Sequence, residues 1–600
     1  MNNTILNSYS GIKTHQFGLD SISNNIANVN TPGYRENIPE FKSLLSQHID
    51  SINSNTVSSD NNFGVSASSN AISTKNGNYK PSDGEFDVAY SGKGWFVVGK
   101  NQNGSMTIAE DGYEANQQNY FTRDGSFNRD ADGYIVNASG YYLYGVDLGK
   151  IQGQTFNNTS TQEEDLKALG GNKLQPLKIP QDLNYQPTKT TKLDIALNLN
   201  PNKTPAALQD FLFEDSGDFN QENLDNLDLG ALFNFQKEPL DAKINNDMRI
   251  TITQNGETKE ITLKYGNDGA SNNQFRTFKD LKDLLKEKTG LDFDISRDDK
   301  NIPTKPISFE IKNPSSEPMQ LTLGGKFIDK LGLNTAKLEM NPNDKQVTHP
   351  IYIGAFTSNS EVFDEKGEKF ILQTKYFLQN TGTKDENQKW ITKSAIYDKN
   401  GENMISKNQT ISTIEFDQDN KPISKPIELD FKDSKISYSF GGTKDRVSSN
   451  FNYQDSGITK TDTDGKQAGK LTDLKIDENG IITLYFDNGA SAPMGRIGIA
   501  AFINDQGLRK AGGNMFEISQ GISNQGEAKT LSGNPILGWD ENNQSQLKFG
   551  KVLYKYLETS NTDVTSALTN LILMQRGYSM SAKAFGTGDD LIKEAINLKK

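Results

Sequence analysis

The sequence predicts a multidomain protein that is mainly β, with an α-helix at each terminus. Its 600 residues correspond to about three or four domains of ordinary size. Apolar residues recur at helical spacing near both ends of the chain. Between the ends, apolar and polar residues alternate and turn motifs are frequent, which is typical of β-structure.

The N-terminal segment is expected to form one helix. Its apolar residues are three, four or seven positions apart, so they share one helical face. The helix is expected to end at residues 30–33, because Pro32 disfavours the α conformation in the residue before it and Gly33 tolerates a positive φ. The apolar face consists of Ile5, Tyr9, Ile12, Leu19, Ile22, Ile26 and Val29.

The C-terminal segment repeats this pattern over a longer stretch. Ser560 or Thr562 is expected to cap the helix, with Asp563 in its first turn. Three glycines are each expected to weaken the helix by up to about 1 kcal/mol, namely Gly577, Gly586 and Gly588. The apolar face consists of Leu557, Val564, Leu568, Leu571, Gln575, Tyr578, Ala582 and Phe585, continued less regularly by Leu591, Ile592 and Ile596.

Each apolar face must be buried against something, and two arrangements satisfy this requirement. The first is an ordinary helix pair within one chain, packed on a globular domain. The second is a coiled-coil-like stem that joins the two termini and packs against other copies of the chain. The periodicity of the apolar residues does not distinguish between them.

The middle of the chain contains several local signals. Residues 193–199 alternate as one strand with Leu193, Ile195, Leu197 and Leu199 on the same face. Asn255-Gly256 predicts a hairpin between strands at 248–253 and 260–265. One internal helix is expected after Thr277, with Asp280 completing a capping box and Gly290 closing the helix.

An Asp-x-x-Gly pattern predicts type I turns followed by a glycine in the left-handed conformation. It occurs at Asp130–Gly133, Asp364–Gly367, Asp398–Gly401 and Asp477–Gly480. The first of these also matches the first half of a calcium loop. The second half does not match. Val136 and Ser139 occupy the ninth and twelfth positions, and the twelfth must be a Glu that binds calcium through both carboxylate oxygens. We therefore interpret Asp130 and Asp132 as turn residues and expect no metal.

Composition excludes several classes of function. The net charge is −13 without a long basic run, which disfavours nucleic-acid binding. No apolar stretch approaches about 18 residues, so no membrane insertion is expected. The chain has no cysteine and three widely separated histidines, so neither a catalytic triad nor a metal site is indicated. We expect no enzyme activity and no cofactor. The N-terminus lacks the pattern of a cleaved signal peptide.

Short motifs in a fixed order resemble those of the bacterial flagellar rod and hook axial protein family. The N-terminal motif is at 19–34, LDSISNNIANVNTPGY. The motifs of the shared β-core are GWFVV at 94–98, FTRDGSF at 121–127, and DGYIVN at 132–137 with Gly140. The C-terminal signature is LETSN at 557–561 and QRGY at 575–578.

Further motifs resemble the hook members of this family more than the rod members. They are VFDEKG at 362–367 with Trp390, DGKQAGKL at 464–471, IDENGII at 476–482, Asn488-Gly489, IAAFIN at 499–504 and QGL at 506–508. The distal rod protein, similar at both ends, is much shorter. Between Pro205 and Pro350 no motif is recognised, so this α+β segment is expected to be an inserted domain.

The resemblance implies a fold in which the terminal helices pair in a coiled-coil-like stem, with β-rich domains strung outward. It favours the stem over the ordinary helix pair. The helical stem is expected at 1–35 and 557–600, followed by a connecting segment at 36–84. The remaining expected parts are a proximal β-domain at 85–190 and 455–545, an outer β-domain at 191–205 and 350–454, and an inserted outer domain at 206–349.

The function implied is that of a structural subunit of the flagellar hook, which polymerises into a flexible tubular joint that transmits motor torque to the filament. The implied partners are copies of itself, the distal rod, the hook cap, the hook–filament junction and the flagellar export apparatus. The implied location is the extracellular hook and basal body, reached without a cleaved signal peptide. The alternatives are another rod or hook-type axial protein and, in a different class, a secreted β-rich adhesin or hydrolase.

Overall fold

The protein is represented by a computed structural model that describes residues 2–44, 46–48, 60–62, 64–109, 112–158, 160–202, 204–214, 217–240, 247–267, 272–296, 304–333, 335–522, 528–540 and 546–598. The chain divides into two compact units. The first combines Met1–Gln186 with Gly469–Lys600, and the second is Pro187–Ala468. The predicted class is confirmed, because both units are mainly β and the helices at the two termini pack together.

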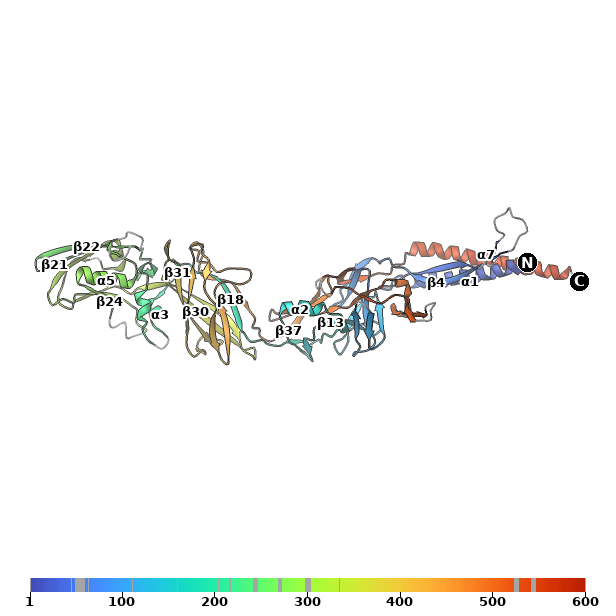
Figure 1. Ribbon diagram of the computed structural model, residues 1–600, viewed down its shortest axis with the longest axis horizontal. Coiled ribbons are helices and arrows are strands. Elements are labelled where there is room, and N and C mark those ends of the chain that lie inside the picture. Colours follow the sequence, from blue (N-terminus) through green and yellow to red (C-terminus); the bar gives the residue numbers. More distant parts are fainter. Residues whose placement is uncertain are drawn as a thin grey trace. The chain divides into compact units, whose positions relative to one another are not determined.

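The first unit contains the two terminal helices, α1 (Asn2–Ala27) and α7 (Val564–Asn597), which lie side by side (Figure 1). A long hairpin of β1 (Asn37–Ser43) and β4 (Val65–Ile72) packs along α1. Two short pairings follow, β5 (Tyr79–Pro81) with β47 (Tyr556–Glu558) and β6 (Val88–Gly92) with β46 (Gly550–Tyr554). Both pairings join the N-terminal part of the chain to its C-terminal part.

The β-domain of the first unit is built around β7 (Trp95–Gly99), whose five residues are all buried. This strand pairs with β10 (Asn119–Thr122), β13 (Tyr142–Asp147) and β40 (Ile499–Ala501). The other main elements of the domain are β8 (Met106–Ala109), β11 (Phe127–Arg129), β12 (Ile135–Asn137), α2 (Gln162–Leu169), β16 (Lys173–Pro176), β37 (Gly469–Ile476), β38 (Ile481–Phe486), β39 (Ser491–Ile497), β41 (Leu508–Gly512) and β42 (Met515–Ile518).

The second unit contains two sheets with a common core. The smaller sheet has the order β34 (Ile427–Phe431), β35 (Ser434–Ser439), β18 (Lys192–Asn198) and β36 (Gly457–Thr463). The larger sheet includes β29 (Tyr352–Phe363), β30 (Lys369–Asn380), β31 (Gln388–Tyr397) and β32 (Thr410–Phe416). The alternation predicted for 193–199 is confirmed, because its four leucine and isoleucine side chains are buried in this core with Tyr376 and Trp390.

Residues 206–349 form an α+β lobe of the second unit. Its main sheet contains β21 (Asp247–Gln254), β22 (Glu257–Tyr265), β26 (Met319–Gly324) and β27 (Thr335–Met340). The other principal elements are α3 (Leu208–Leu212), α4 (Gln221–Asp225), α5 (Phe278–Thr289), β24 (Asp292–Ile295), β25 (Phe309–Lys312), α6 (Lys326–Leu331) and β28 (Lys345–Val347). The two ends of the lobe meet, because Pro205 pairs with Gly354.

The local predictions for this lobe are confirmed. Asn255 and Gly256 both have positive φ values, 56° and 87°, as a type I′ hairpin turn requires. Thr277 and Asp280 form the capping box of α5, and Gly290 ends the helix with a φ of 74°. The core of the lobe is not self-contained, however, since Ile353, Phe377 and Ile391 of β29, β30 and β31 belong to it.

The boundary between the units differs from the expected one. Residues 455–468 were expected in the proximal β-domain, but β36 pairs with β18 of the second unit from Leu193–Thr463 to Asn198–Gly457. Residues 187–190 also belong to the second unit. The boundary is set by strand pairing between residues more than 250 positions apart, which local sequence patterns do not reveal.

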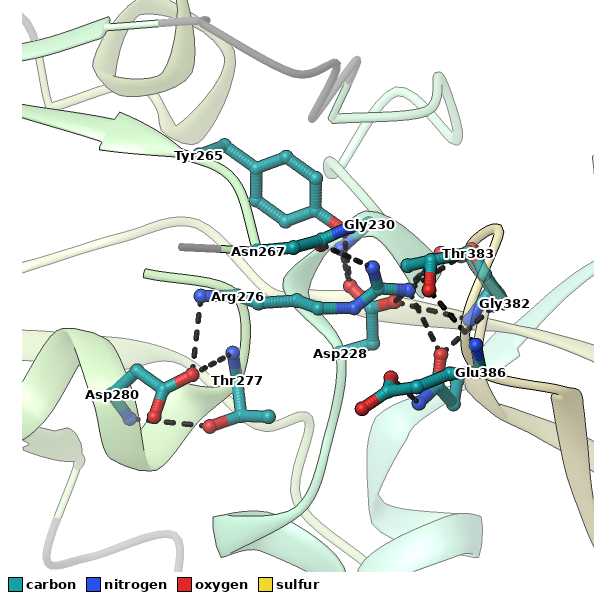
Figure 2. Close-up of polar contacts among 12 residues, drawn as sticks. Asp228, Gly230, Tyr265, Asn267, Arg276, Thr277, Asp280, Gly382, Thr383 and Glu386 are labelled. Atoms are coloured by element: carbon teal, nitrogen blue, oxygen red, sulfur yellow. Dashed lines mark hydrogen bonds and ion pairs between the residues drawn. The ribbon is translucent and has the colours of Figure 1, made fainter. Parts of the chain in front are cut away.

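A buried carboxylate holds the lobe against the loop that follows β30 (Figure 2). Asp228 Oδ2 lies 2.9 Å from Arg276 Nη2 and accepts hydrogen bonds from the Thr381 main chain at 3.0 Å and hydroxyl at 2.6 Å. Asp228 Oδ1 accepts from the Tyr265 hydroxyl at 2.5 Å and from the Gly230 main chain at 2.8 Å. Burial and the neighbouring Asp228 charge raise the pKa of Tyr265, so this hydroxyl remains a donor.

Replacing Asp228 with alanine is expected to lower the free energy of unfolding of the second unit by about 3–5 kcal/mol, because it leaves the Arg276 charge buried without its anion. Chemical denaturation of the purified subunit measures this loss. Glu238→Ala is the matched control, since Glu238 pairs with Lys330 at the surface, 2.8 Å away, and exposed pairs contribute little. Equal loss in the two variants would contradict the proposed role of the buried carboxylate.

Candidate assembly surface

The two terminal helices approach each other closely through small residues. A methyl group added to Gly577 would lie 2.5 Å from the His15 ring, and one added to Gly588 would lie 2.9 Å from Ile5. A methyl group on Gly11 would similarly lie 2.8 Å from Ser581 Oγ. Early residues of α1 thus meet late residues of α7, so the helices are antiparallel. We call this contact the seam.

The glycines of α7 therefore differ in their roles. Gly577 and Gly588 are buried in the seam, whereas a methyl group added to Gly586 would have no neighbour within 4 Å. Gly577 and Gly588 weaken the helix, but the absence of a side chain at these positions lets α1 and α7 pack closely. The sequence alone suggested only that all three weaken the helix.

Gly577→Val is expected to lower the temperature at which the assembled polymer dissociates, because its side chain overlaps the His15 ring. Gly586→Ala is the matched control on the same helix. It should leave that temperature unchanged or raise it, since alanine favours the helix by about 1 kcal/mol over glycine. Turbidity or light scattering during heating measures both. A lower dissociation temperature for Gly586→Ala alone would contradict the assignment of the seam.

Most residues of the predicted apolar faces lie beside the seam, and Ile5, which contacts Gly588, lies at its edge. Tyr9 is 48% exposed and Leu568 is 46% exposed in the isolated chain. Val564, Tyr578 and Phe585 are also exposed. We call the stripe face the set Ile5, Tyr9, Ile12, Leu19 and Ile26 of α1 with Val564, Leu568, Leu571, Tyr578, Ala582 and Phe585 of α7. An apolar surface of this kind marks an interaction site when it is contiguous.

Three predicted members of the faces belong elsewhere. Leu557 lies in strand β47, opposite Lys80 of β5, so its prediction as a helical residue was wrong. Its spacing of seven from Val564 fits a helix by coincidence. Val29 lies beyond the end of α1, and Ile22 is buried in the described structure. The helix cap is Asp563, which accepts from the Thr565 main chain at 2.9 Å, rather than Ser560 or Thr562.

A groove of about 690 Å³ lies between α1 and the β1–β4 hairpin. It is lined mainly by apolar groups, among them Leu6, Tyr9, Phe17, Leu44 and Val65. Leu6 and Leu44 are exposed. The groove is a further apolar surface of α1, and it shares Tyr9 with the stripe face.

Residues at the end of the N-terminal motif, in the β-core motif at 121–127 and in the C-terminal motif at 557–561 meet near the end of α1 and the start of α7. Glu558 Oε1 lies 3.0 Å from Arg35 Nη2, and Glu558 Oε2 lies 3.3 Å from Arg123 Nη1. All three side chains are buried. The Gly33 main chain donates to the Glu558 carbonyl at 2.8 Å. We call this buried cluster of Arg35, Arg123 and Glu558 the junction.

Close backbone approach explains a glycine of these motifs. A methyl group on Gly33, which has a φ of 66°, would lie 2.3 Å from the Asp124 main-chain nitrogen. Asn561 of the C-terminal motif accepts from the Glu36 main chain at 2.7 Å and donates to the Lys75 carbonyl at 2.8 Å. The junction therefore fastens both ends of the chain to the β-domain through side chains and backbone together.

The charges at the junction depend on one another. Burial, together with the neighbouring Arg123, lowers the pKa of Arg35 to about 10 despite the opposing effect of Glu558. Burial also lowers the pKa of Arg123, and the negative charge of Glu558 partly offsets this by raising it. Two buried guanidinium groups thus share one carboxylate. Arg123 and Glu558 lie within recognised motifs and Arg35 directly follows one, but the sequence did not show that they meet.

In the described part of the chain, no group of three or more histidine, aspartate or glutamate side chains is placed to hold a metal ion. No described helix combines the length and apolar character that crossing a membrane requires. The Asp130 turn is confirmed, since its carboxylate accepts from the main chains of Asp132 at 3.0 Å and Tyr134 at 2.7 Å.

Three family models match parts of the chain. They are "Flagella basal body rod protein" over residues 5–35, "Flagellar hook protein FlgE/F/G D1 domain" over 89–195, and "Flagellar basal body rod FlgEFG protein C-terminal" over 555–598. These ranges include α1, much of the β-domain and α7. They also include the three residues of the junction.

Several relatives extend the similarity over the full chain. The flagellar hook protein FlgE of Caulobacter vibrioides is 24% identical over 100% of both chains. FlgE of Helicobacter pylori strain J99 is 23% identical over 98% of this chain and 99% of its own. The crystal structure of the H. pylori flagellar hook protein FlgE2 matches with 43% identity and a TM-score of 0.70, covering 80% of this chain and all of that one.

Proposed function

The chain belongs to the flagellar hook protein family, and we propose that the stripe face of its paired terminal helices is the surface through which copies join. It is a structural subunit of the bacterial flagellar hook. As such, it assembles with copies of itself in the axial structure of the flagellum. The observation that supports the stripe face is the exposure of its large apolar side chains in the isolated chain, of which Leu568 at 46% is one.

The finer role proposed is that of a flexible tubular joint that transmits motor torque to the filament. A permanent apolar contact between helix pairs suits the wall of such a tube. The second unit carries many exposed polar and charged side chains, among them Lys189 with Glu365 and Lys435 with Glu428. Polar contacts exchange with water and allow neighbouring subunits to slide, whereas closely packed apolar contacts resist gradual deformation.

The proposed partners beyond the chain itself are the distal rod, the hook cap, the hook–filament junction and the flagellar export apparatus. The proposed route is export without a cleaved signal peptide. A chain without cysteine suits transport as an unfolded polypeptide, because no disulfide has to be opened. The five domain ranges expected from the sequence remain part of this proposal, with the boundary shifted as described above.

Electron cryo-microscopy of purified hooks tests the proposal directly. We expect density for this chain throughout the hook, with the stripe face of each copy buried against another copy. Hooks in which the helix pairs are separated by solvent, or which contain this chain only at one end, would contradict the proposal. The latter outcome would instead indicate a different axial protein of the flagellum.

A further inference from the structure

Helix α7 carries a second exposed apolar strip, which includes Leu591 of the predicted C-terminal face and two residues outside the heptad pattern. It consists of Leu573, Met580 and Leu591, which are 58%, 66% and 55% exposed. Their spacing of seven and eleven residues places them on one side of a helix. We call this set the flank. No described residue of the same chain buries these three side chains.

The seam fixes where the flank lies. Gly577, Ser581 and Gly588 of α7 face α1 through the contacts given above. Met574 faces it too, because a methyl group added to Gly18 would lie 3.0 Å from Met574 Sδ. At about 100° per residue, the flank lies roughly a quarter turn from the seam on one side. The α7 part of the stripe face lies roughly a quarter turn away on the other side.

The antiparallel packing then places both halves of the stripe face together. The seam residues of α1 are Gly11, His15 and Gly18. Tyr9, Ile12 and Leu19 lie about a quarter turn from them around the helix axis, in the same sense of rotation as the stripe face on α7. Because α1 and α7 run in opposite directions, this side coincides with that of Leu568. The helix pair therefore has two apolar faces on opposite sides, the stripe face and the flank.

The side of α7 opposite the seam differs in character. Arg576, Ser579, Lys583, Asp590 and Glu594 lie there and are exposed. Burying a charged side chain without a partner costs free energy. This strip is therefore expected to stay in water, so the exposed apolar surfaces of α7 that remain for neighbouring copies are the stripe face and the flank.

We propose that the stripe face of one copy packs against the flank of the next copy. This inference rests on the proposed function, since it names the partner surface of the stripe face. A symmetric contact that joins two stripe faces would leave both flanks in water. A head-to-tail contact buries both faces of every copy and generates an open helical assembly instead of a closed dimer. That is the kind of contact from which a hook-length polymer is built.

Site-directed cross-linking tests this pairing. Because the chain has no native cysteine, only the introduced cysteines can react. Single cysteines replace Val564, Leu568 or Tyr578 on the stripe face and Leu573, Met580 or Leu591 on the flank. Assembled polymers of the full chain are treated with a short bis-maleimide, which joins two cysteine sulfurs. We expect no cross-linked species from polymers of any single variant.

Double variants with one cysteine on each face should give a ladder of dimers, trimers and larger species for at least one of the pairings. Leu568→Cys combined with Lys583→Cys is the control and should give no ladder. Dimers from a single stripe-face variant would show a symmetric contact and overturn the proposal. Polymers that form normally but give no ladder with any pairing would also overturn it, while leaving the proposed function intact.

A second measurement uses growth of the polymer. The variant Leu573→Asp/Met580→Asp keeps its stripe face, so it should add to one end of a wild-type polymer and block further addition there. When about one subunit in ten of the mixture is the variant, the polymers measured in electron micrographs should be several times shorter than those of the wild type alone. Unchanged length with the variant incorporated would contradict the head-to-tail contact. Failure of the wild-type chain to polymerise would instead contradict the proposed function.

Discussion

Glu558→Ala is expected to destabilise the first unit by about 3–5 kcal/mol, because two buried guanidinium groups lose the carboxylate they share. Glu558 lies 3.0 Å from Arg35 and 3.3 Å from Arg123. The two arginines would then repel each other without compensation. Trp95 reports the change, since the guanidinium carbons of both arginines lie within 6 Å of its ring, at 5.9 and 5.7 Å.

Denaturant unfolding followed by tryptophan fluorescence measures the loss. Glu478→Ala is the matched control, because Glu478 pairs with Lys551 at the surface of the same unit, 3.1 Å away, and exposed pairs contribute little. Glu558→Gln separates charge from shape, since glutamine keeps the volume and some hydrogen bonds but not the charge. An unfolding midpoint for Glu558→Ala equal to that of Glu478→Ala would contradict the role given to the junction.

The elements predicted correctly from the sequence are those whose geometry is decided by adjacent residues. The turn at Asn255-Gly256 follows from two residues that tolerate positive φ, and the start of α5 follows from the capping box at Thr277. The Asp-x-x-Gly turns are equally local, and Gly367, Gly401 and Gly480 all have φ values of 76–77°. Such signals do not depend on distant parts of the chain.

The elements predicted wrongly depend on pairing across the chain. Leu557 fits a helical repeat, but residues 556–558 pair with Tyr79–Pro81, almost the whole length of the chain away. Likewise, β36 pairs with β18 and moves residues 455–468 into the second unit. Periodicity describes which residues share a face, whereas strand partners are chosen by the assembled fold.

The assembly surface was predicted in part. The stripe face follows from heptad spacing, but the seam does not, because Gly11, Gly18 and Gly577 carry no hydrophobic signal. Two glycines seven positions apart in α1, at 11 and 18, were the available sign of close helix packing. The junction was hidden for another reason, since Arg35, Arg123 and Glu558 are far apart in the sequence and meet only in the folded chain.

Leu568→Asp is expected to abolish polymerisation while leaving the isolated subunit folded. Leu568 is 46% exposed in the single chain, so a charge there is tolerated until another copy covers it. A buried unpaired carboxylate then costs several kcal/mol. A loss of about 3 kcal/mol per contact raises the critical concentration by roughly a hundredfold.

Lys583→Asp is the matched control, because it places the same carboxylate on the exposed polar side of the same helix. This variant should polymerise like the wild type, and both variants should show the same unfolding midpoint for the β-domains. Sedimentation of polymer after assembly in vitro gives the critical concentration, and motility in soft agar gives the outcome in cells. Normal hooks from Leu568→Asp would show that the stripe face stays in water in the polymer. Equal failure of both variants would show instead that α7 tolerates no added negative charge, so that the loss does not report on the stripe face.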